Sequence, residues 1–292
     1  DLYPHDYKGP HCDWPPYQRV TEPPELVEHI RCEYAALLSM CDEYLGKVID
    51  LMDELDLWKD TMLIVNTDHG FLLGEHGWWA KCAMPFYDEI IHTPLFIWDP
   101  RSQIQGERRE SLVQTIDLAP TLLEYFGVHI PSDMQGKPLR HTVALDHPVR
   151  EAALFGIHGG HVNCTDGRYV YMRAPKEAEN NPLYDYTLMP MRHGGGRAFI
   201  HHKGLETMEL AEPFSFTKGL KTLKINSRVG NQAPFLYPTL LYDLEKDPSQ
   251  QHPMQDKVIE QQMIRHLVRL MKENNCPEEQ WIRLGLEEEM DA

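Results

Sequence analysis

The sequence predicts an α/β protein that ends in a smaller α+β domain, and three features of the chain point to this fold class. An amphipathic pattern over residues 24–56 indicates a long helix. Two short apolar runs, Met62–Val65 and Leu95–Trp98, indicate buried strands. Further along the chain the pattern changes to an antiparallel hairpin followed by a last helix. We therefore predict an α/β domain over residues 1–147 and a smaller α+β domain over residues 148–292.

The first 24 residues are rich in Pro, Tyr and His and are predicted to form an irregular arm, in which His5 and His11 could serve as ligands. The helix that follows starts at a proline pair, which a first helical turn tolerates. Its acidic residues are expected to form a solvated face. Its apolar residues recur at helical spacing and are Leu26, Ile30, Leu37, Cys41, Tyr44, Val48, Leu51 and Leu55. Together with the strand after it, this helix is half of a β–α–β unit whose first strand is missing.

The chemistry is expected in the segment TMLIVNTDHGFLLGEHGWWAK (61–81), just after the first predicted strand. Asp68 and His69 follow that strand, and in open α/β sheets ligands collect beyond the carboxyl ends of strands. A carboxylate beside an imidazole suits a divalent metal, because both groups present lone pairs. The alternative for an Asp-His pair is an ordinary surface turn.

Lys81 is expected to return to the same point, because glycines at positions 70, 74 and 77 allow the backbone to turn back. A lysine near a metal-bound oxyanion can hold sulfate or phosphate and neutralise a leaving oxygen. His76, inside this turn, is a candidate acid or a hydrogen-bond donor that supports the metal ligands. Its alternative is a ring that packs in the turn beside Trp78 and Trp79.

The next elements follow from capping and spacing. Asp88 and Glu89 belong to a short helical stretch and are interpreted as a polar helix face, with active-site carboxylates as the alternative. The strand Leu95–Trp98 is apolar throughout and is predicted to be internal to the sheet. Asp117 is predicted to cap a helix that Gly127 ends.

The C-terminal part is predicted from two strand patterns and one helix. Residues 153–163 and 168–174 are joined by the turn Thr165–Gly167. His158 and His161 either border a substrate pocket or end a strand. The triple glycine 194–196 is predicted to be a loop, and His201 and His202 to be on the surface. The last helix, which ends near Asn274, has one apolar face formed by Val258, Ile259, Met263, Leu267 and Met271.

Composition excludes several classes of protein. The net charge of −17 argues against a general nucleic-acid binder, and no apolar run is long enough for a membrane span. An anionic substrate must therefore be captured by a local positive site rather than by the overall field. The six cysteines contain no C-x-x-C pair, which favours reduced thiols and a cytoplasmic location.

The strings NTDHG and GEHGWWAK closely resemble the second metal-binding segment of the sulfatase family, within the alkaline phosphatase superfamily. The resemblance continues, in the order of the family, in HTPLFIWDP (92–100), TIDLAPTLLEYFGV (115–128), MQGKPL (134–139) and LYDLEKDP (241–248). It implies a mixed sheet between helices, followed by a smaller antiparallel sheet with one helix.

The resemblance also implies roles for single residues. Asp68 and His69 match the metal-binding pair of the family, and Lys81 matches its substrate-contacting lysine. The metal it implies is most often Ca²⁺. Many arylsulfatases have Asn at the second place of the pair, whereas the imidazole of His69 resembles the phosphonate monoester hydrolases and admits Mn²⁺ or Zn²⁺ as alternatives.

The family nucleophile is a formylglycine made within C/S-x-P-x-R, and this sequence contains no such motif. We therefore expect a fragment that is inactive alone and that works with an N-terminal half upstream, with a homo-oligomer as a further option. The first hypothesis is a sulfatase acting on a sulfate ester of a small molecule or glycan, without nucleic-acid or membrane partners. The alternatives are a phosphonate monoester hydrolase or phosphodiesterase of the same superfamily, and a non-catalytic module derived from a sulfatase.

Overall fold

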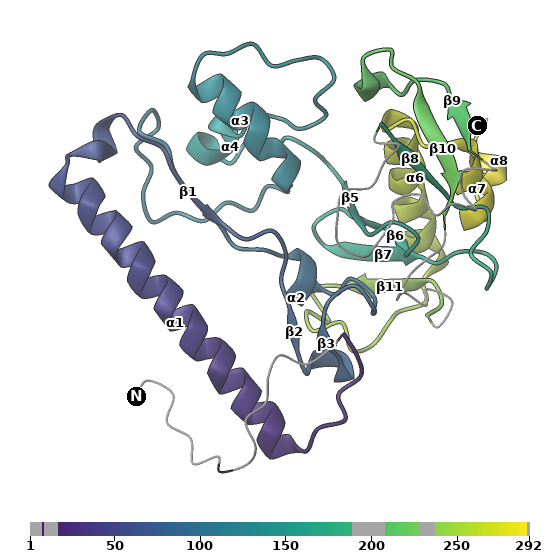
Figure 1. Ribbon diagram of the computed structural model, residues 1–292, viewed down its shortest axis with the longest axis horizontal. Helices are drawn as coiled ribbons and strands as arrows, with labels where there is room; N and C mark the ends of the chain where they lie inside the picture. The colour runs from purple at the N-terminus through teal and green to yellow at the C-terminus, as the bar shows by residue number, and fades with distance from the viewer. Residues whose placement is uncertain (1–7, 9–16, 189–207, 228–236, 291–292) are drawn as a thin grey trace. The chain divides into compact units, whose positions relative to one another are not determined.

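The structure is a computed structural model that describes residue 8 and residues 17–188, 208–227 and 237–290 (Figure 1). His5, His11, the triple glycine 194–196 and the pair His201–His202 lie outside the described residues. The chain forms two compact units, one of residues 1–110 and 140–147, the other of residues 111–139 and 148–292. None of the helices in the described ranges is both long and apolar enough to cross a membrane.

The first unit opens with helix α1 (Pro24–Glu54), in which a proline occupies the first turn as predicted. Its apolar residues are buried only in places, with Met52 near its C-terminal end and Ile30 near its start. Ile30 is buried there against Trp79 and Ala80. Further along, Tyr44 and Leu55 remain more than half exposed. The predicted helix is therefore confirmed, whereas the burial of its whole apolar face is not observed among the described residues.

The two predicted strands of this unit pair with each other. A short 3₁₀ turn, η1 (Leu57–Lys59), leads to β1 (Leu63–Asn66), and β1 pairs antiparallel with β4 (Leu95–Trp98). The prediction that Leu95–Trp98 is internal to a sheet is wrong for the described residues, since the pair has two strands and Phe96 is 67% exposed. An apolar run indicates a strand, but it carries no information on direction or on the number of neighbours.

A small hairpin and two short helices complete the first unit. Strands β2 (Leu72–Leu73) and β3 (Trp79–Ala80) are joined through η2 (Glu75–Gly77). Helix α2 spans Asp88–Ile91 and helix α4 spans Arg140–Leu145. A hydrogen bond connects the hairpin to α1, in which the Nε atom of Arg31 on the helix donates to the Leu73 carbonyl at 2.8 Å.

The second unit contains the predicted antiparallel sheet with helices. Its four strands are β5 (Ala153–Gly156), β6 (Val162–Thr165), β7 (Tyr169–Arg173) and β11 (Leu240–Asp243), in the order β11-β7-β6-β5. The predicted turn at 165–167 joins β6 to β7. The predicted strand 153–163 is divided in two, since Ile157–His161 forms a turn between β5 and β6.

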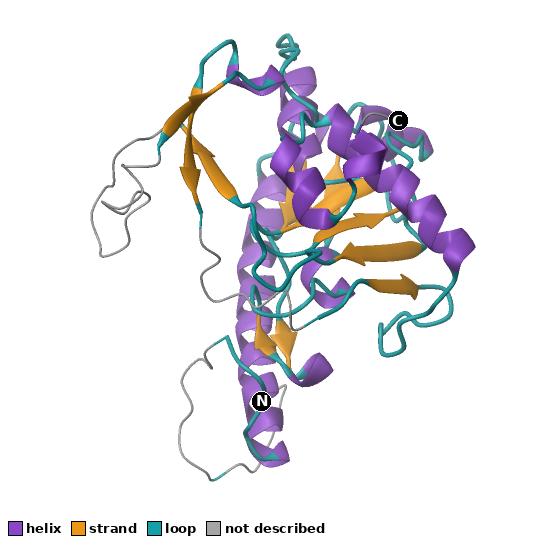
Figure 2. Cartoon of the chain, turned by 90° about the vertical axis from the view of Figure 1, so that its right-hand side faces the viewer, coloured by secondary structure: helices purple, strands orange, loops and turns teal. Residues whose placement is uncertain are grey.

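The remaining elements of this unit are three helices, a second sheet and a helical segment before the first strand. Helix α6 (Lys257–Glu273) is followed by α7 (Glu278–Leu284) and α8 (Glu287–Met290). Figure 2 shows helices lying across one face of the four-stranded sheet. A second sheet has three strands in the order β8-β10-β9. These strands are β8 (Tyr184–Thr187), β9 (Glu209–Ala211) and β10 (Thr222–Asn226). A 3₁₀ turn, η4 (Ser215–Thr217), precedes β10. Before these lie η3 (Thr115–Asp117) and α3 (Leu118–Tyr125).

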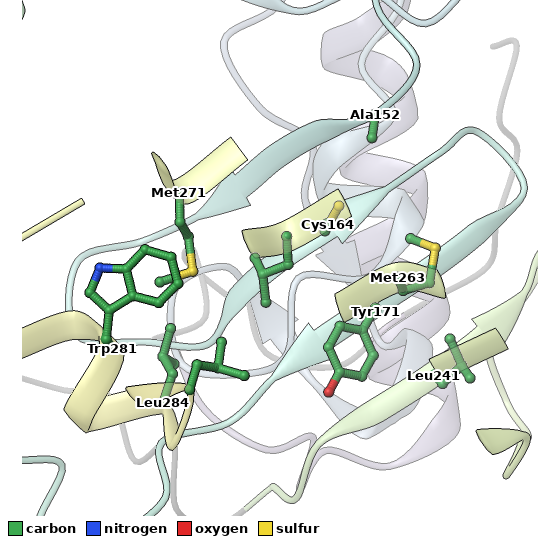
Figure 3. Packing of buried hydrophobic residues seen from close by; sticks show 10 residues of the cluster. Ala152, Cys164, Tyr171, Leu241, Met263, Met271, Trp281 and Leu284 are labelled. Carbon is green, nitrogen blue, oxygen red and sulfur yellow. The ribbon is translucent and has the colours of Figure 1, made fainter. Parts of the chain in front are cut away.

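The core of the second unit lies between α6 and the four-stranded sheet (Figure 3). Met263 and Leu267 are fully buried on the face of α6 that the spacing predicted, whereas Val258, also predicted on this face, is 76% exposed near the start of the helix. From the sheet, Cys164 and Tyr171 fill the opposite side of the cluster. This burial removes a continuous apolar surface from water and is the main stabilising contribution in this unit.

Residues 111–139 were predicted with the first domain, but the structure groups them with the second unit. The reason is a buried ion pair, in which both terminal nitrogens of Arg150 bind the carboxylate of Asp117. The same carboxylate accepts from the Lys137 amide at 2.8 Å. The Gln114 side chain donates to the Leu154 carbonyl at 2.8 Å. Asp117 thus joins distant segments, whereas the prediction that it caps the following helix is wrong, since its side chain makes no capping hydrogen bond to α3.

Candidate active site

The candidate site begins where β1 ends, and its first group is Asp68. One carboxylate oxygen, Oδ1, accepts from the His69 amide at 3.0 Å, and the other, Oδ2, lies 3.2 Å from His69 Nε2. The Asp68 side chain is 81% exposed, so its free lone pairs are open to a ligand. Desolvation by itself would raise the pKa of this carboxyl, but His69, the backbone amides and Lys81 outweigh it and the pKa is lowered. Asp68 is therefore an anionic oxygen ligand at neutral pH.

The imidazole of His69 is oriented by its own neighbour in the chain. Its Nδ1 atom lies 2.9 Å from the Gly70 carbonyl oxygen. Because a carbonyl only accepts, Nδ1 carries the hydrogen, and the lone pair of the neutral ring is at Nε2. Metal-bound histidines are held in the same way, by a hydrogen bond from the ring nitrogen that does not bind the metal. His69 thus presents the lone pair of Nε2 on the side where Asp68 lies.

Lys81 is brought to this pair by the register of the hairpin. Leu72 pairs with Ala80, so the residue after Ala80 lies beside the residues that precede Leu72. The Lys81 Nζ atom accordingly contacts His69 Nε2. The turn between the strands needs Gly74 at φ 103°. The structure thus brings together Asp68, His69 and Lys81, the three side chains that the spacing predicted to meet.

The backbone around Lys81 is unusual for residues with side chains. Ala80 and Cys82 both have positive φ, at 69° and 74°. Residues other than glycine adopt this region at a cost of the order of 1 kcal/mol, and such strain concentrates at functional sites. We interpret the two values as a requirement for holding the lysine at one place.

His76 lies at the tip of the same hairpin, in a different environment. Its ring is stacked on Tyr87, with ring centroids 3.6 Å apart and planes at 5°. Its Nε2 atom lies 3.3 Å from a carboxylate oxygen of Glu89, and its side chain is 5% exposed. Burial would raise the pKa of Glu89, but the hydrogen bond with His76 lowers it on balance. These contacts are with Tyr87 and Glu89, and they leave the predicted catalytic role of His76 as a prediction.

The acidic pair on α2 divides between two histidines. Asp88 lies 3.1 Å from His92 one turn later, which is the helix-face role predicted for it. Glu89 instead faces His76, which the sequence did not indicate, because the pair depends on how the hairpin folds onto the helix. The feature of the sequence that comes nearest to indicating this contact is the glycine-rich turn that contains His76.

The donor set fits one side of a divalent metal site. Asp68 supplies an oxygen and His69 the Nε2 nitrogen that Lys81 contacts, and an oxygen with an imidazole nitrogen is a combination used for several divalent metals. Within the described ranges, no group of three or more His, Cys, Asp or Glu side chains could hold a metal ion. Since Ca²⁺ prefers six or more oxygen ligands, this pair needs further ligands from other residues.

The predicted histidines of the C-terminal part lie in the second unit. His158 Nε2 is 3.0 Å from Asp185 Oδ1 and 3.1 Å from Ser227 Oγ. His161 is buried, and its Nε2 atom faces the Tyr237 and Pro238 carbonyls. Burial lowers the pKa of His161. His161 therefore lies buried at the start of a strand, whereas the His158 side chain is about half exposed and pairs with Asp185.

Comparison with solved structures gives proteins with a similar fold. Those that are similar over most of this chain include the following two. One is a protein in complex with its substrate D-glucosamine-2-N,6-O-disulfate, with a TM-score of 0.59 and 18% identity over 87% of this chain and 43% of that one. The other is the phosphonate monoester hydrolase of Agrobacterium radiobacter, with a TM-score of 0.54 and 20% identity over 85% and 42%. The fold of this chain is therefore similar to part of each of these two proteins.

The sequence comparisons point to one family of proteins. Residues 4–128, which include the whole candidate site, match the family Sulfatase. N-acetylglucosamine-6-O-sulfatase of Bacteroides thetaiotaomicron is 34% identical over 108 residues, 37% of this chain and 19% of that protein. Arylsulfatase K of Homo sapiens is 30% identical over 147 residues, 48% of this chain and 27% of that protein. PehA of Trinickia caryophylli, a multifunctional alkaline phosphatase superfamily protein, is 32% identical over 123 residues, 42% and 24%. The matched part therefore spans about a fifth to a quarter of each relative.

Proposed function

We propose that this chain is part of a metal-dependent hydrolase of sulfate esters, in which Asp68, His69 and Lys81 form one wall of the active site. The observation that carries the proposal is the convergence of a carboxylate, an imidazole lone pair and an ammonium group at the end of β1. This convergence lies inside the segment that matches the sulfatase family.

The roles of the three residues follow from their chemistry. Asp68 Oδ2 and His69 Nε2 would hold a divalent cation, with Ca²⁺ as the first expectation and Mn²⁺ or Zn²⁺ as alternatives. When bound, such a cation acts as a Lewis acid that polarises an oxygen of the ester. Lys81 holds a sulfate oxygen as a point charge and stabilises the negative charge that develops on the transferred group and the leaving oxygen. The exposed carboxylate of Asp68 leaves the substrate side of this wall open.

The nucleophile of the proposed reaction comes from outside this sequence. The chain contains no C/S-x-P-x-R motif in which a formylglycine could be made. We therefore propose that the formylglycine and the remaining metal ligands belong to a longer protein, and that these 292 residues alone hydrolyse nothing.

The proposed substrate class is a sulfate ester of a small molecule or glycan. Support comes from the names of relatives and neighbours, which include an N-acetylglucosamine-6-O-sulfatase and a protein bound to a disulfated glucosamine. The net charge of −17 requires that such an anion be captured locally, and the Lys81 ammonium is suited to this.

A second function is favoured by one specific residue. His69 stands where many arylsulfatases have Asn, and the imidazole is the feature that resembles phosphonate monoester hydrolases. Both esters are monoanions at neutral pH, so both suit the same wall of donors.

The experiment is turnover of an aryl sulfate and an aryl phosphonate by the full-length protein, purified with its metal. Faster turnover of the sulfate supports the proposal, and preferential turnover of the phosphonate replaces it with the second function. Turnover of neither ester, in a protein loaded with metal, leaves the non-catalytic module as the function.

A further inference from the structure

His76 is held in a specific position at the tip of the β2–β3 hairpin. Its backbone has φ 55° and ψ 15°, in the left-handed region that residues with side chains seldom adopt. The ring nevertheless makes two ordered contacts, a parallel stack on Tyr87 and the 3.3 Å approach of Nε2 to Glu89. With a side chain only 5% exposed, this histidine is a fixed attachment between the hairpin and the start of α2.

The same helix contacts the loop that carries the metal-binding pair. The Gly70 amide donates to the Ile90 carbonyl at 2.7 Å. A Cβ atom at Gly70 would come within 1.8 Å of the Glu89 carbonyl oxygen, so only glycine allows this approach. On its other side, the Gly70 carbonyl accepts from Nδ1 of His69. The backbone of Glu89 and Ile90 therefore lies against the loop of His69, and the Glu89 side chain faces His76.

Helix α2 cannot maintain this arrangement by itself. It comprises four residues, Asp88–Ile91, and a helix of one turn has no independent stability. Its place therefore depends on contacts made with neighbouring segments. The Glu89 carboxylate provides a charged contact with the hairpin, through His76.

We propose that Glu89 and His76 are positioning residues, which hold α2 against Gly70 and thereby keep the His69 ring with its hydrogen on Nδ1 and with Nε2 turned toward Asp68 and Lys81. His76 thus acts on the site through its neighbours rather than as an acid. The consequence for catalysis rests on the proposed function, whereas the orientation of His69 does not.

The test follows the tautomer of His69 directly. The full chain is labelled with ¹⁵N-histidine, and its imidazole nitrogens are observed by NMR at about pH 8, where an ordinary imidazole is neutral. A His69→Gln variant identifies the signals of His69. The wild type is expected to show one tautomer, with the hydrogen on Nδ1. In Glu89→Ala, the loss of the anchor lets the Gly70 carbonyl move away, and the tautomer with hydrogen on Nε2 appears.

Two further variants separate positioning from general destabilisation. Asp88→Ala removes the other His–carboxylate pair of the same helix, whose partner His92 is 78% exposed, and should leave the His69 signals unchanged. Glu89→Gln keeps an acceptor of the same length and should restore the wild-type tautomer. Circular dichroism checks that each variant is folded.

A second readout is the affinity for Mn²⁺ alone, measured by electron paramagnetic resonance. We expect Glu89→Ala to weaken the affinity for Mn²⁺ about tenfold or more, because loss of a residue that supports a metal ligand has an effect of this size. Asp88→Ala should leave the affinity unchanged. A folded Glu89→Ala variant with wild-type His69 signals and affinity overturns the inference, and so does an equal change in Asp88→Ala. If the full-length protein turns over no sulfate ester while the His69 signals respond as expected, the proposed function fails and the positioning role stands.

Discussion

The ammonium group of Lys81 contacts Nε2 of His69, although 12 positions separate the two residues in the chain. The contact exists because the short β2–β3 hairpin reverses the chain with Leu72 opposite Ala80. Since Nδ1 of the same ring is bound to the Gly70 carbonyl, the lone pair that Lys81 meets is the one that a metal would use. A cation donor and a metal-binding nitrogen thus share one small region, as hydrolysis of an anionic ester requires.

The first prediction concerns Lys81. In the full-length protein, Lys81→Met should lower kcat for an aryl sulfate by roughly 10²–10³-fold, because it removes a charge that stabilises the transition state. The matched control is Lys59→Met, since Lys59 lies on the surface of the same unit and pairs with Asp56. Steady-state kinetics on both variants make the comparison. Equal activity of Lys81→Met and Lys59→Met would exclude Lys81 from the chemistry.

The second prediction concerns the close approach at Gly70. Gly70→Ala should lower the free energy of unfolding by about 2 kcal/mol or more, because the new Cβ atom collides with the Glu89 carbonyl and α2 must move. Gly46→Ala is the control. This glycine lies within α1, a Cβ there meets nothing within 4 Å, and the change should stabilise the helix by about 0.5–1 kcal/mol. Urea unfolding measures both values, and a loss at Gly70 no larger than at Gly46 would contradict the geometry.

The third prediction concerns the buried ion pair of the second unit. Asp117→Ala leaves the Arg150 guanidinium buried without its partner and removes the acceptor of the Lys137 amide. We expect a loss of about 3–5 kcal/mol in the free energy of unfolding. The exposed pair of Lys47 and Glu43 on α1 serves for comparison, and Glu43→Ala should cost less than about 0.5 kcal/mol. Similar losses for the two variants would mean that Asp117 does not join residues 111–139 to this unit.

The fourth prediction is a pH dependence that arises from Cys164. Burial raises the pKa of this thiol to about 12, so the folded protein keeps its proton at a pH where the unfolded chain, near its ordinary value of about 8.5, has lost it. This contribution to stability is complete below about pH 8.5 and declines as the pH rises toward 12, because the unfolded state then binds fewer protons.

The Cys164→Ala variant tests this pH dependence. Between about pH 9 and 11 the free energy of unfolding of the wild type should fall with pH more steeply than that of the variant, by up to about 1.4 kcal/mol per pH unit. Other groups titrate in both proteins and cancel in the difference. Parallel stability curves would contradict the protected thiol.

The parts of this structure that the sequence predicts well are those set by nearby residues. The strand before Asp68 and the return of Lys81 depend on a local apolar run and on turn glycines, so both were predictable. The last helix was predictable for the same reason, from its apolar spacing, and in the structure Asp256 caps its first turn.

The features that were missed depend on contacts between distant segments. The contact of Glu89 with His76 requires the hairpin to lie on α2, and neither residue signals this by itself. Likewise, Asp117 was predictable as a residue of a helix start, but its pairing with Arg150, 33 positions away, was not. The direction of β4 relative to β1 was missed too, because an apolar strand suits parallel and antiparallel neighbours alike.

The central claim is that Asp68, His69 and Lys81 form one wall of a metal site that binds a sulfate ester. Its most direct test is a crystal structure of the full-length protein with Mn²⁺ and sulfate, in which anomalous scattering locates the metal. The account predicts Mn²⁺ within bonding distance of Asp68 and His69 Nε2, with a sulfate oxygen bound by the Lys81 ammonium. A metal bound elsewhere, with Lys81 still on His69, would contradict it.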